Sequence, residues 1–354
     1  MILLVTGDFN NIGKSSYFGE CIYNELKNQY RDIDFYNGGQ LYILDQIINN
    51  ISKYKTIIWM PNIDNSIDKY LPKIKVLNKK CLLVTSKRND NDKYSTFEII
   101  ERMFKNHSNL CIVINKQKEY NFKILDTLGN IWINTDTISG MSLMLIKLIN
   151  YISNLSRVES VNVNFNSNIN IEPKFLDIIH SYGDIFKTKI NGVINKERFL
   201  GNISTRCMFG FPSYKLNDMI FVSQRNINKE TLDSTGFVPV QLLEDKVFFS
   251  GFNKPSVDTA VQIRLYNYYK NVNYIIHGHI YTDSGYITDK YIPCGYVEEF
   301  NEIINIIPDN NASNFSVNLI GHGCLILSKN LDYFNSIKFI SRNFPEYMTL
   351  STIR

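Results

Sequence analysis

Two histidines stand two residues apart in the apolar segment "YIIHGHIYTD", and these side chains could bind a metal. The chain has five histidines in 354 residues, so this segment holds two of them. Side chains of a strand alternate between its faces, so His277 and His279 would project from the same face, with backbone positions roughly 7 Å apart. Two imidazoles on one face of a rigid strand can bind a transition metal. The alternative is a half-buried strand whose histidines lie in polar surroundings.

A third histidine lies in "NLIGHGCLIL", where Gly321 and Gly323 flank His322 and interrupt a strand-like run. Glycine on both sides lets the backbone turn tightly and approach a neighbouring group closely. Two histidines at alternating strand positions and one distant histidine match a catalytic metal site with an open coordination position. A His-Gly turn without a metal is the alternative interpretation.

Upstream of the histidine strand, the segment "GFNKPSVDTAVQIRLYNYY" predicts the start of a helix. Ser256 would be the N-cap of this helix, and Asp258 in its first turn would be favoured by the helix dipole. Capping explains both residues without any function. A carboxylate at a helix N-terminus just before a metal-bearing strand is also well placed to act as a general acid or base.

The elements that must position these residues follow from the pattern after residue 172. A helix in "PKFLDIIHSYGDIFKTK" leads into a series of strands, and the histidine strand lies between two further helices, at about 257–270 and 295–306. This order predicts an α/β/α or α+β domain with a largely antiparallel sheet. Besides the histidine strand, we expect strands around 199–204, 219–223, 237–240, 246–249 and 317–327.

The first half of the chain has a different pattern. Continuous Ile/Leu/Val runs alternate with helix-like segments, which is typical of a parallel sheet covered on both faces. The polar stretch "SRVESVNVNFNSNINIEP" indicates a boundary between a Rossmann-like α/β domain of residues 1–157 and a second domain of residues 172–354. The expected strands are "MILLVTG", "DIDFYNG", "KTIIWMP", "KCLLVTS", "LCIVIN" and "NIWIN", and the expected helices lie at 17–29, 41–53, 65–75, 95–106 and 141–155.

One loop of this first domain, "VTGDFNNIGKSS", is similar to a phosphate-binding loop. Gly7, Gly13, Lys14 and Ser15 would offer amides, a positive charge and a hydroxyl to a ligand or nucleotide. Five residues separate Gly7 from Gly13, where the phosphate-binding loop has four. Loops that follow parallel strands are polar in any case, so a ligand site and an ordinary loop both stay open.

Composition sets limits on the partners of the protein. A net charge of +4 does not indicate a nucleic-acid or membrane partner, and the apolar N-terminus "MILLVTGDFN" is expected to be a first strand and not a signal peptide. The cysteines form no close pairs, which predicts a reduced, cytoplasmic protein without disulfides. They stand at positions 21, 81, 111, 207, 294 and 324.

Four motifs occur in the order found in the class II aldolase/adducin family: "GNISTR", "KPSVDT", "NVNYIIHGHIY" and "NLIGHGCLIL". The chain resembles this family over roughly residues 172–340. The resemblance implies that His277, His279 and His322 bind Zn2+ or another divalent transition metal, and that Asp258 is the catalytic carboxylate. The metal would stabilise an enediolate while a carbon–carbon bond breaks.

The resemblance also implies where a substrate binds. Asn202 and Ser256 match positions that contact the substrate's phosphate in the family. The phosphate loop of the family corresponds here to "VSQRNI", which contains Ser223, Arg225 and Asn226. In this changed loop, Arg225 could supply charge to an anionic group.

The function implied is a zinc-dependent class II aldolase-type lyase of carbohydrate metabolism. Its substrate would be a small sugar, sugar phosphate or related hydroxy-carbonyl compound, cleaved by a retro-aldol reaction. Because Asp258 resembles the ribulose-phosphate 4-epimerase branch, an epimerase or dehydratase of the same family is an alternative. A non-catalytic module that binds a nucleotide or similar anion through the first domain is another.

The resemblance further implies a homotetramer. In such tetramers a tyrosine from the neighbouring subunit can protonate the leaving group. The tyrosines that we consider for this role are Tyr281, Tyr286, Tyr333 and Tyr347.

Overall fold

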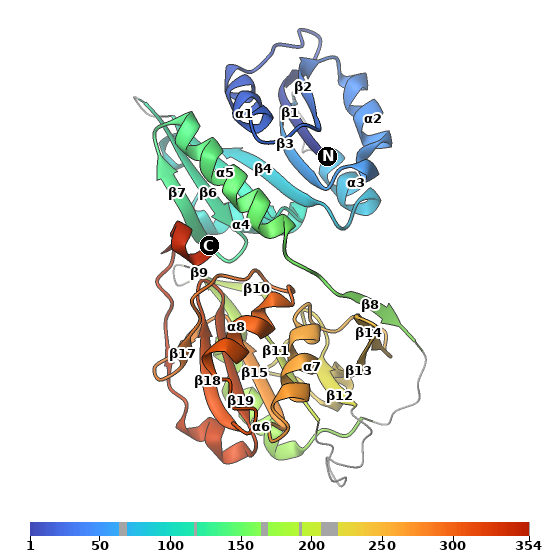
Figure 1. The fold of residues 1–354 in the computed structure, drawn as a ribbon, viewed down its shortest axis with the longest axis vertical. Helices are drawn as coiled ribbons and strands as arrows, with labels where there is room; N and C mark the ends of the chain where they lie inside the picture. Colours follow the sequence, from blue (N-terminus) through green and yellow to red (C-terminus); the bar gives the residue numbers. More distant parts are fainter. Residues whose placement is uncertain (64–68, 117–118, 164–168, 191–192, 207–218, 354) are drawn as a thin grey trace. The chain divides into compact units, whose positions relative to one another are not determined.

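The computed structural model of the chain describes residues 1–63, 69–116, 119–163, 169–190, 193–206 and 219–353. These residues fold into two compact units (Figure 1). Unit 1 comprises Met1–Asn154 and Phe344–Thr349, and unit 2 comprises Leu155–Asn343 and Leu350–Arg354. The chain thus returns to unit 1 for a short segment after most of unit 2, a connection that the sequence analysis did not anticipate.

Unit 1 contains an eight-stranded sheet of order β2-β1-β3-β4-β5-β6-β7-β21. The neighbours from β2 to β5 are parallel, whereas β6 is antiparallel to β5 and to β7. The elements are β1 (Ile2–Phe9), α1 (Tyr17–Lys27), β2 (Ile33–Gly39), α2 (Leu41–Asn49), η1 (Ile51–Lys53), β3 (Thr56–Asn62), α3 (Tyr70–Leu77), β4 (Leu82–Arg88), η2 (Asp90–Asp92), α4 (Thr96–Asn106), β5 (Leu110–Lys116), β6 (Tyr120–Asp126), β7 (Asn130–Thr135), α5 (Ile138–Ser153) and β21 (Glu346–Tyr347).

The mostly parallel sheet of unit 1 confirms the predicted fold class for this half. The parallel strands β1, β3, β4 and β5 are the Ile/Leu/Val runs of the sequence, and most of their central side chains are fully buried. Strand β6 was missed, because "YNFKILD" mixes polar and apolar residues and does not form a continuous apolar run. Part of the predicted helix 65–75 lies outside the described residues, and α3 begins at Tyr70.

Unit 2 contains a nine-stranded sheet of order β17-β18-β19-β15-β11-β12-β13-β14-β8. Only the outer pairs β17–β18 and β14–β8 are parallel. The elements are β8 (Glu159–Asn162), α6 (Pro173–Ser181), η3 (Gly183–Phe186), β9 (Lys187–Ile190), β10 (Val193–Phe199), β11 (Asn202–Thr205), β12 (Ile220–Ser223), η5 (Ser234–Gly236), β13 (Phe237–Leu243), β14 (Lys246–Phe249), α7 (Thr259–Tyr268), β15 (Tyr274–Gly278), β16 (Tyr281–Thr282), β17 (Tyr286–Ile287), α8 (Glu298–Ile306), β18 (Asn314–Leu319), β19 (Gly323–Ser328), η6 (Leu331–Ser336), β20 (Phe339–Ile340) and η7 (Leu350–Ile353).

The sheet of unit 2 packs against helices on both faces. Helices α7 and α8 share one apolar cluster with Ile275 of β15, and α6 shares a second cluster with Tyr274 and Ile276 (Figure 1). Because side chains of a strand alternate, His277 lies on the same side as Ile275, toward α7 and α8. This mostly antiparallel α/β arrangement confirms the predicted fold class for the second half.

Three boundaries differ from the sequence prediction. The expected strand 317–327 is a hairpin of β18 and β19, since the glycines around His322 turn the chain through a sharp reversal. The expected helix in "PKFLDIIHSYGDIFKTK" ends at Ser181, and Gly183 begins a 3-10 turn that leads into β9. The polar stretch expected to be a connection contains β8, which pairs with β14 and so belongs to the sheet of unit 2.

The cysteines that the structure describes are all free, and Cys207 lies outside the described residues. Among the described residues, we find no helix with the length and apolarity that crossing a bilayer would require.

Candidate metal centre

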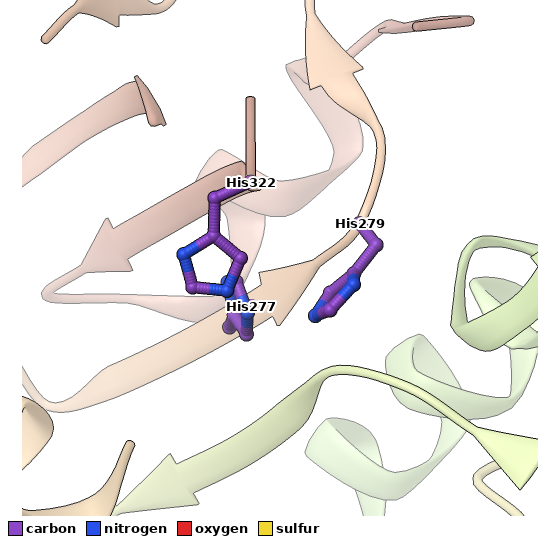
Figure 2. A group of neighbouring side chains, drawn as sticks. All are labelled: His277, His279 and His322. Carbon is purple, nitrogen blue, oxygen red and sulfur yellow. The ribbon is translucent and has the colours of Figure 1, made fainter. Parts of the chain in front are cut away.

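The three histidines of the sequence prediction converge in unit 2 (Figure 2). His277 lies on the central strand β15, His279 follows just after the strand, and His322 lies in the turn between β18 and β19. The ring centroids are 5.0 Å apart for His277 and His279, 4.8 Å for His277 and His322, and 5.1 Å for His279 and His322. One nitrogen of each ring lies within 4.8 Å of the others, so the rings could share one ion.

His277 is oriented by its own sheet. Its Nδ1 lies 2.8 Å from the carbonyl oxygen of Cys324 on the neighbouring strand β19, so Nδ1 carries the proton and donates. Its Nε2 is buried without a hydrogen-bond partner. Burial, followed by the charge of His322, lowers the pKa of His277 to about 4. The ring is therefore neutral at pH 7, with a lone pair on Nε2.

His279 has a similar environment. Its Nδ1 is also buried without a hydrogen-bond partner. Burial and the neighbouring imidazoles lower the pKa of His279 well below its usual value. Like His277, this residue offers an unprotonated nitrogen at neutral pH.

His322 is held by a carboxylate that the sequence analysis missed. Its Nδ1 lies 2.6 Å from Oε1 of Glu299, and its Nε2 lies 3.0 Å from Sγ of Cys294. Burial alone would lower the pKa of His322, but Cys294 and Glu299 outweigh burial and raise it well above its usual value. A carboxylate on the outer nitrogen of a histidine fixes the ring and increases its basicity, as is common for metal ligands.

The turn that carries His322 is also fixed from outside. Arg342 donates to the carbonyl oxygens of His322 and Gly321, at 3.1 and 2.9 Å. A Cβ added to Gly323, whose φ is +156°, would lie 2.1 Å from the carbonyl oxygen of Gly278. Only glycine permits this close approach of the turn to the end of β15.

This donor set fits a divalent transition metal. Imidazole nitrogens are ordinary ligands of zinc and similar ions. A buried nitrogen without a partner costs free energy, and the site holds two of them. A bound ion would satisfy both.

Asp258 lies beside the histidines, with Oδ2 4.0 Å from Nε2 of His277. The backbone N–H of Gly295 donates to its Oδ1 at 2.7 Å, and Nδ2 of Asn202 donates to its Oδ2 at 3.0 Å. Asp258 occupies the N-cap position of α7, and its side chain makes no capping hydrogen bond. The predicted cap at Ser256 is wrong, because the helix begins later, at Thr259, which bonds back to the Ser256 carbonyl oxygen.

The predicted substrate-binding residues divide into two groups. Asn202 and Ser256 lie with Asp258: Asn202 donates to Ser256 Oγ at 3.0 Å and accepts from Gln262. The second group, which consists of Ser223, Arg225 and Asn226, lies in and directly after β12. These residues form hydrogen bonds with the backbone of neighbouring segments. There Ser223 Oγ accepts from Ile203 N, Asn226 Oδ1 accepts from Phe199 N, and Arg225 N donates to the Lys254 carbonyl oxygen.

The predicted ligand loop of unit 1 is folded back on itself. Gly13 N donates to Oδ1 of Asn10, and the Asp8 amide donates to the carbonyl oxygen of Lys14. A Cβ at Gly7 would lie 2.5 Å from the Gly38 nitrogen, so close packing against the end of β2 already requires glycine there. Ligand binding by Gly7, Gly13, Lys14 and Ser15 stays a prediction.

Part of unit 2 matches a known protein family. Residues 196–288 match the family model described as Class II Aldolase and Adducin N-terminal domain. The chain therefore contains a class II aldolase/adducin domain, as the motifs predicted. Asp258, His277 and His279 lie inside the matched range, and His322 follows it.

Among solved structures, part of the chain is similar to L-fuculose 1-phosphate aldolase, with 17% identity and a TM-score of 0.34 over 48% of this chain and 82% of that one. An aldolase II superfamily protein from Pseudomonas syringae has 10% identity and a TM-score of 0.30 over 46% of this chain and 69% of its own. The DNA/pantothenate metabolism flavoprotein from Streptococcus pneumoniae has 10% identity and a TM-score of 0.33 over 42% and 97%. No curated protein sequence matches the chain.

Proposed function

We propose that unit 2 is a metal-dependent lyase of the class II aldolase type. It would use zinc and cleave a carbon–carbon bond in a sugar, sugar phosphate or related hydroxy-carbonyl compound. The observation that best supports this is the buried group of His277, His279 and His322, in which two nitrogens lack partners. A divalent ion held there would act as a Lewis acid on substrate oxygens.

We assign proton transfer to Asp258. Its carboxylate lies beside the histidine nitrogens, and Asn202 and Gly295 fix its orientation before any substrate arrives. A carboxylate held in this way can accept a proton from a substrate hydroxyl or carbon and return it to the product. Asn202 and Ser256 surround the same carboxylate, so a substrate that reaches Asp258 also meets their side chains.

Arg225 is the residue that we propose for an anionic group of the substrate. Burial lowers the pKa of its guanidinium, and the charge of Asp258 counteracts this effect, which indicates that the two groups influence each other. We assign Ser223 and Asn226 to the shape of the loop, because their side-chain oxygens already accept backbone hydrogen bonds.

We also propose a cytoplasmic homotetramer, on the resemblance alone. Of the tyrosines considered for proton transfer across a subunit boundary, Tyr286 and Tyr347 have exposed fractions of 55% and 64%. Tyr281 instead accepts a hydrogen bond from the Gly321 amide. Sedimentation analysis of active protein tests this assembly, and a protein that is active as a strict monomer would contradict it.

The proposed function is tested first by metal analysis. Purified protein should contain about one divalent ion per chain, and His277→Ala should lose it. His180→Ala is the matched control, since His180 lies on α6 and bonds the Leu232 carbonyl oxygen. Protein without an ion, or a His277→Ala variant with undiminished metal content, would refute the proposal.

The reaction is tested next with ketoses, ketose phosphates and related hydroxy-carbonyl compounds. Cleavage should release an aldehyde fragment, and the activity should disappear with a chelator and return with zinc. An epimer of the substrate without fragments would instead identify the epimerase alternative.

A further inference from the structure

One short segment, residues 294–299, reaches the candidate metal centre at three points. Cys294 places Sγ 3.0 Å from Nε2 of His322. The amide of Gly295 donates to Asp258, and Glu299 bonds the opposite nitrogen of His322. The thiol therefore lies at the nitrogen of His322 that Glu299 leaves available.

Cys294, which is only partly buried, differs in its surroundings from the buried Cys81 and Cys324. Cys81 and Cys324 belong to apolar clusters, where a thiol serves as a small hydrophobic side chain. Cys294 forms a group with Asp258 and His322 instead, in which the possible ligand atoms all lie within 4.8 Å of one another. Packing alone does not account for a thiol in this polar group.

The geometry suits a thiolate ligand. Zinc binds sulfur at about 2.3 Å and imidazole nitrogen at about 2.0 Å, so two such ligands at a tetrahedral angle lie about 3.5 Å apart. The observed separation of 3.0 Å between Sγ and Nε2 needs only a small increase to admit an ion beside His322, whereas Sγ lies outside the 4.8 Å group of the three histidines and would have to approach His277 and His279 on binding. Nε2 of His277, in a side chain with an exposed fraction of 1%, lacks a hydrogen-bond partner at the same centre.

We propose that Cys294 is a further ligand of the metal bound by His277, His279 and His322. This inference rests on the proposed metal site. Binding would replace by the ion both the thiol proton of Cys294 and the proton that His322 carries on Nε2, and both protons would leave to solvent. A sulfur ligand selects thiophilic ions, so the site should prefer Zn2+ and Co2+ over Mg2+ and Mn2+.

A sulfur ligand also affects how substrate would bind. Three histidines and one thiolate complete a tetrahedral set, whereas catalytic zinc sites keep one position open. Substrate oxygens would therefore have to displace Cys294 or increase the coordination number. The thiolate would thus occupy the open position in the resting state.

Cobalt spectroscopy of the full chain tests this proposal. The Co2+ form should show a near-ultraviolet sulfur-to-cobalt charge-transfer band, together with the visible bands of a four-coordinate ion. Cys294→Ser should still bind Co2+ but without the charge-transfer band. The ratio of its affinities for Zn2+ and Mn2+ should fall at least about tenfold. Cys21→Ser, which changes a cysteine of α1 in unit 1, should keep the band.

Each outcome decides the proposal. A band that persists in Cys294→Ser, or cobalt bound without any charge-transfer band, would overturn it and leave the histidine site intact. Absence of cobalt binding in the unchanged chain would overturn the metal site itself. If Cys294→Ser does not fold, X-ray absorption of the unchanged zinc form decides, since one sulfur neighbour at about 2.3 Å is expected.

Discussion

Oδ2 of Asp258 lies 4.0 Å from Nε2 of His277, although Asp258 stands at the N-cap position of helix α7. From sequence, this carboxylate could cap the helix or transfer protons. Its oxygens accept from Gly295 and Asn202, and no capping hydrogen bond to the helix forms. The side chain is therefore directed at the histidines and not at its own helix.

Asp258→Asn tests the proton-transfer role. The amide cannot take up a proton, so we expect turnover to fall at least about a hundredfold. Metal content should be unchanged, but stability should fall by about 1–3 kcal/mol, since an amide NH2 would face the N–H of Gly295 or Asn202. Asp245→Asn, at an exposed ion pair with Arg264, is the control. Normal turnover in Asp258→Asn would rule out this mechanism.

Glu299→Gln tests the orientation of His322. The neutral amide can still accept from Nδ1 but no longer increases the basicity of the ring. We expect zinc affinity, measured by competition with a chelator, to fall about tenfold or more. Glu302→Gln, on the same helix but outside the site, should bind zinc normally. Equal affinity in both variants would show that Glu299 does not support the ion.

Zinc should stabilise unit 2 selectively. At a free concentration a hundred times the dissociation constant, a ligand contributes about 2.7 kcal/mol. Both tryptophans, Trp59 and Trp132, are buried in unit 1. Zinc should raise the temperature of one calorimetric unfolding transition, whereas the unfolding transition followed by tryptophan emission, which reports unit 1, should keep its temperature. This result would identify unit 2 as the unit that zinc stabilises. A transition insensitive to zinc and chelator would argue against a metal in this unit.

Lys229 predicts a pH-dependent stability. Its side chain is 1% exposed, and its Nζ donates to the Phe199 carbonyl oxygen at 3.3 Å. No carboxylate of the described residues pairs with it. Burial lowers the pKa of Lys229 from 10.5 to about 7. The unfolded chain thus binds the proton more tightly, and the free energy of unfolding should rise with pH between about 7 and 10.5.

Replacing this amine should remove that dependence. A pKa lowered from 10.5 to about 7 corresponds to a cost of roughly 4–5 kcal/mol for the buried charge. Lys229→Met should therefore stabilise unit 2 strongly at pH 6 and much less at pH 10, as measured by urea unfolding. Lys246→Met, at an exposed position of β14, is the control. A gain of equal size at both pH values would disagree with a charged amine at pH 6.

The three histidines were predictable because local patterns place them. His277 lies on β15 as predicted, whereas His279, also predicted on the strand, directly follows its last residue, and His322 lies between glycines that permit a close turn. Glu299 and Cys294 carried no such signal, because their contacts with His322 arise only when the first turn of α8 and the segment before it pack beside the β18–β19 turn. Spacing along the chain does not encode such a contact.

Much of the fold was also predictable, because local sequence patterns define many of its strands and helices. Buried parallel strands such as β4 are continuous apolar runs, and a helix such as α4 has a Ser95–Glu98 capping box. The start of α7 was predicted too early, because Val257 and Asp258 form a turn before the helix, and Pro255 ahead of them pairs with Gln224 in an isolated bridge. That bridge depends on a partner thirty-one positions away along the chain.

The return of residues 344–349 to unit 1 has a consequence for synthesis on the ribosome. Strand β21 pairs with β7, and Phe344 packs against Gly129, so the last strand of the first sheet is translated after most of unit 2. Until then β7 presents an unpaired edge, to which another nascent chain could add a strand. A fragment that stops near residue 155 would keep this edge permanently and would be prone to aggregate. Fusing residues 344–349 to such a fragment through a flexible linker should restore the missing strand.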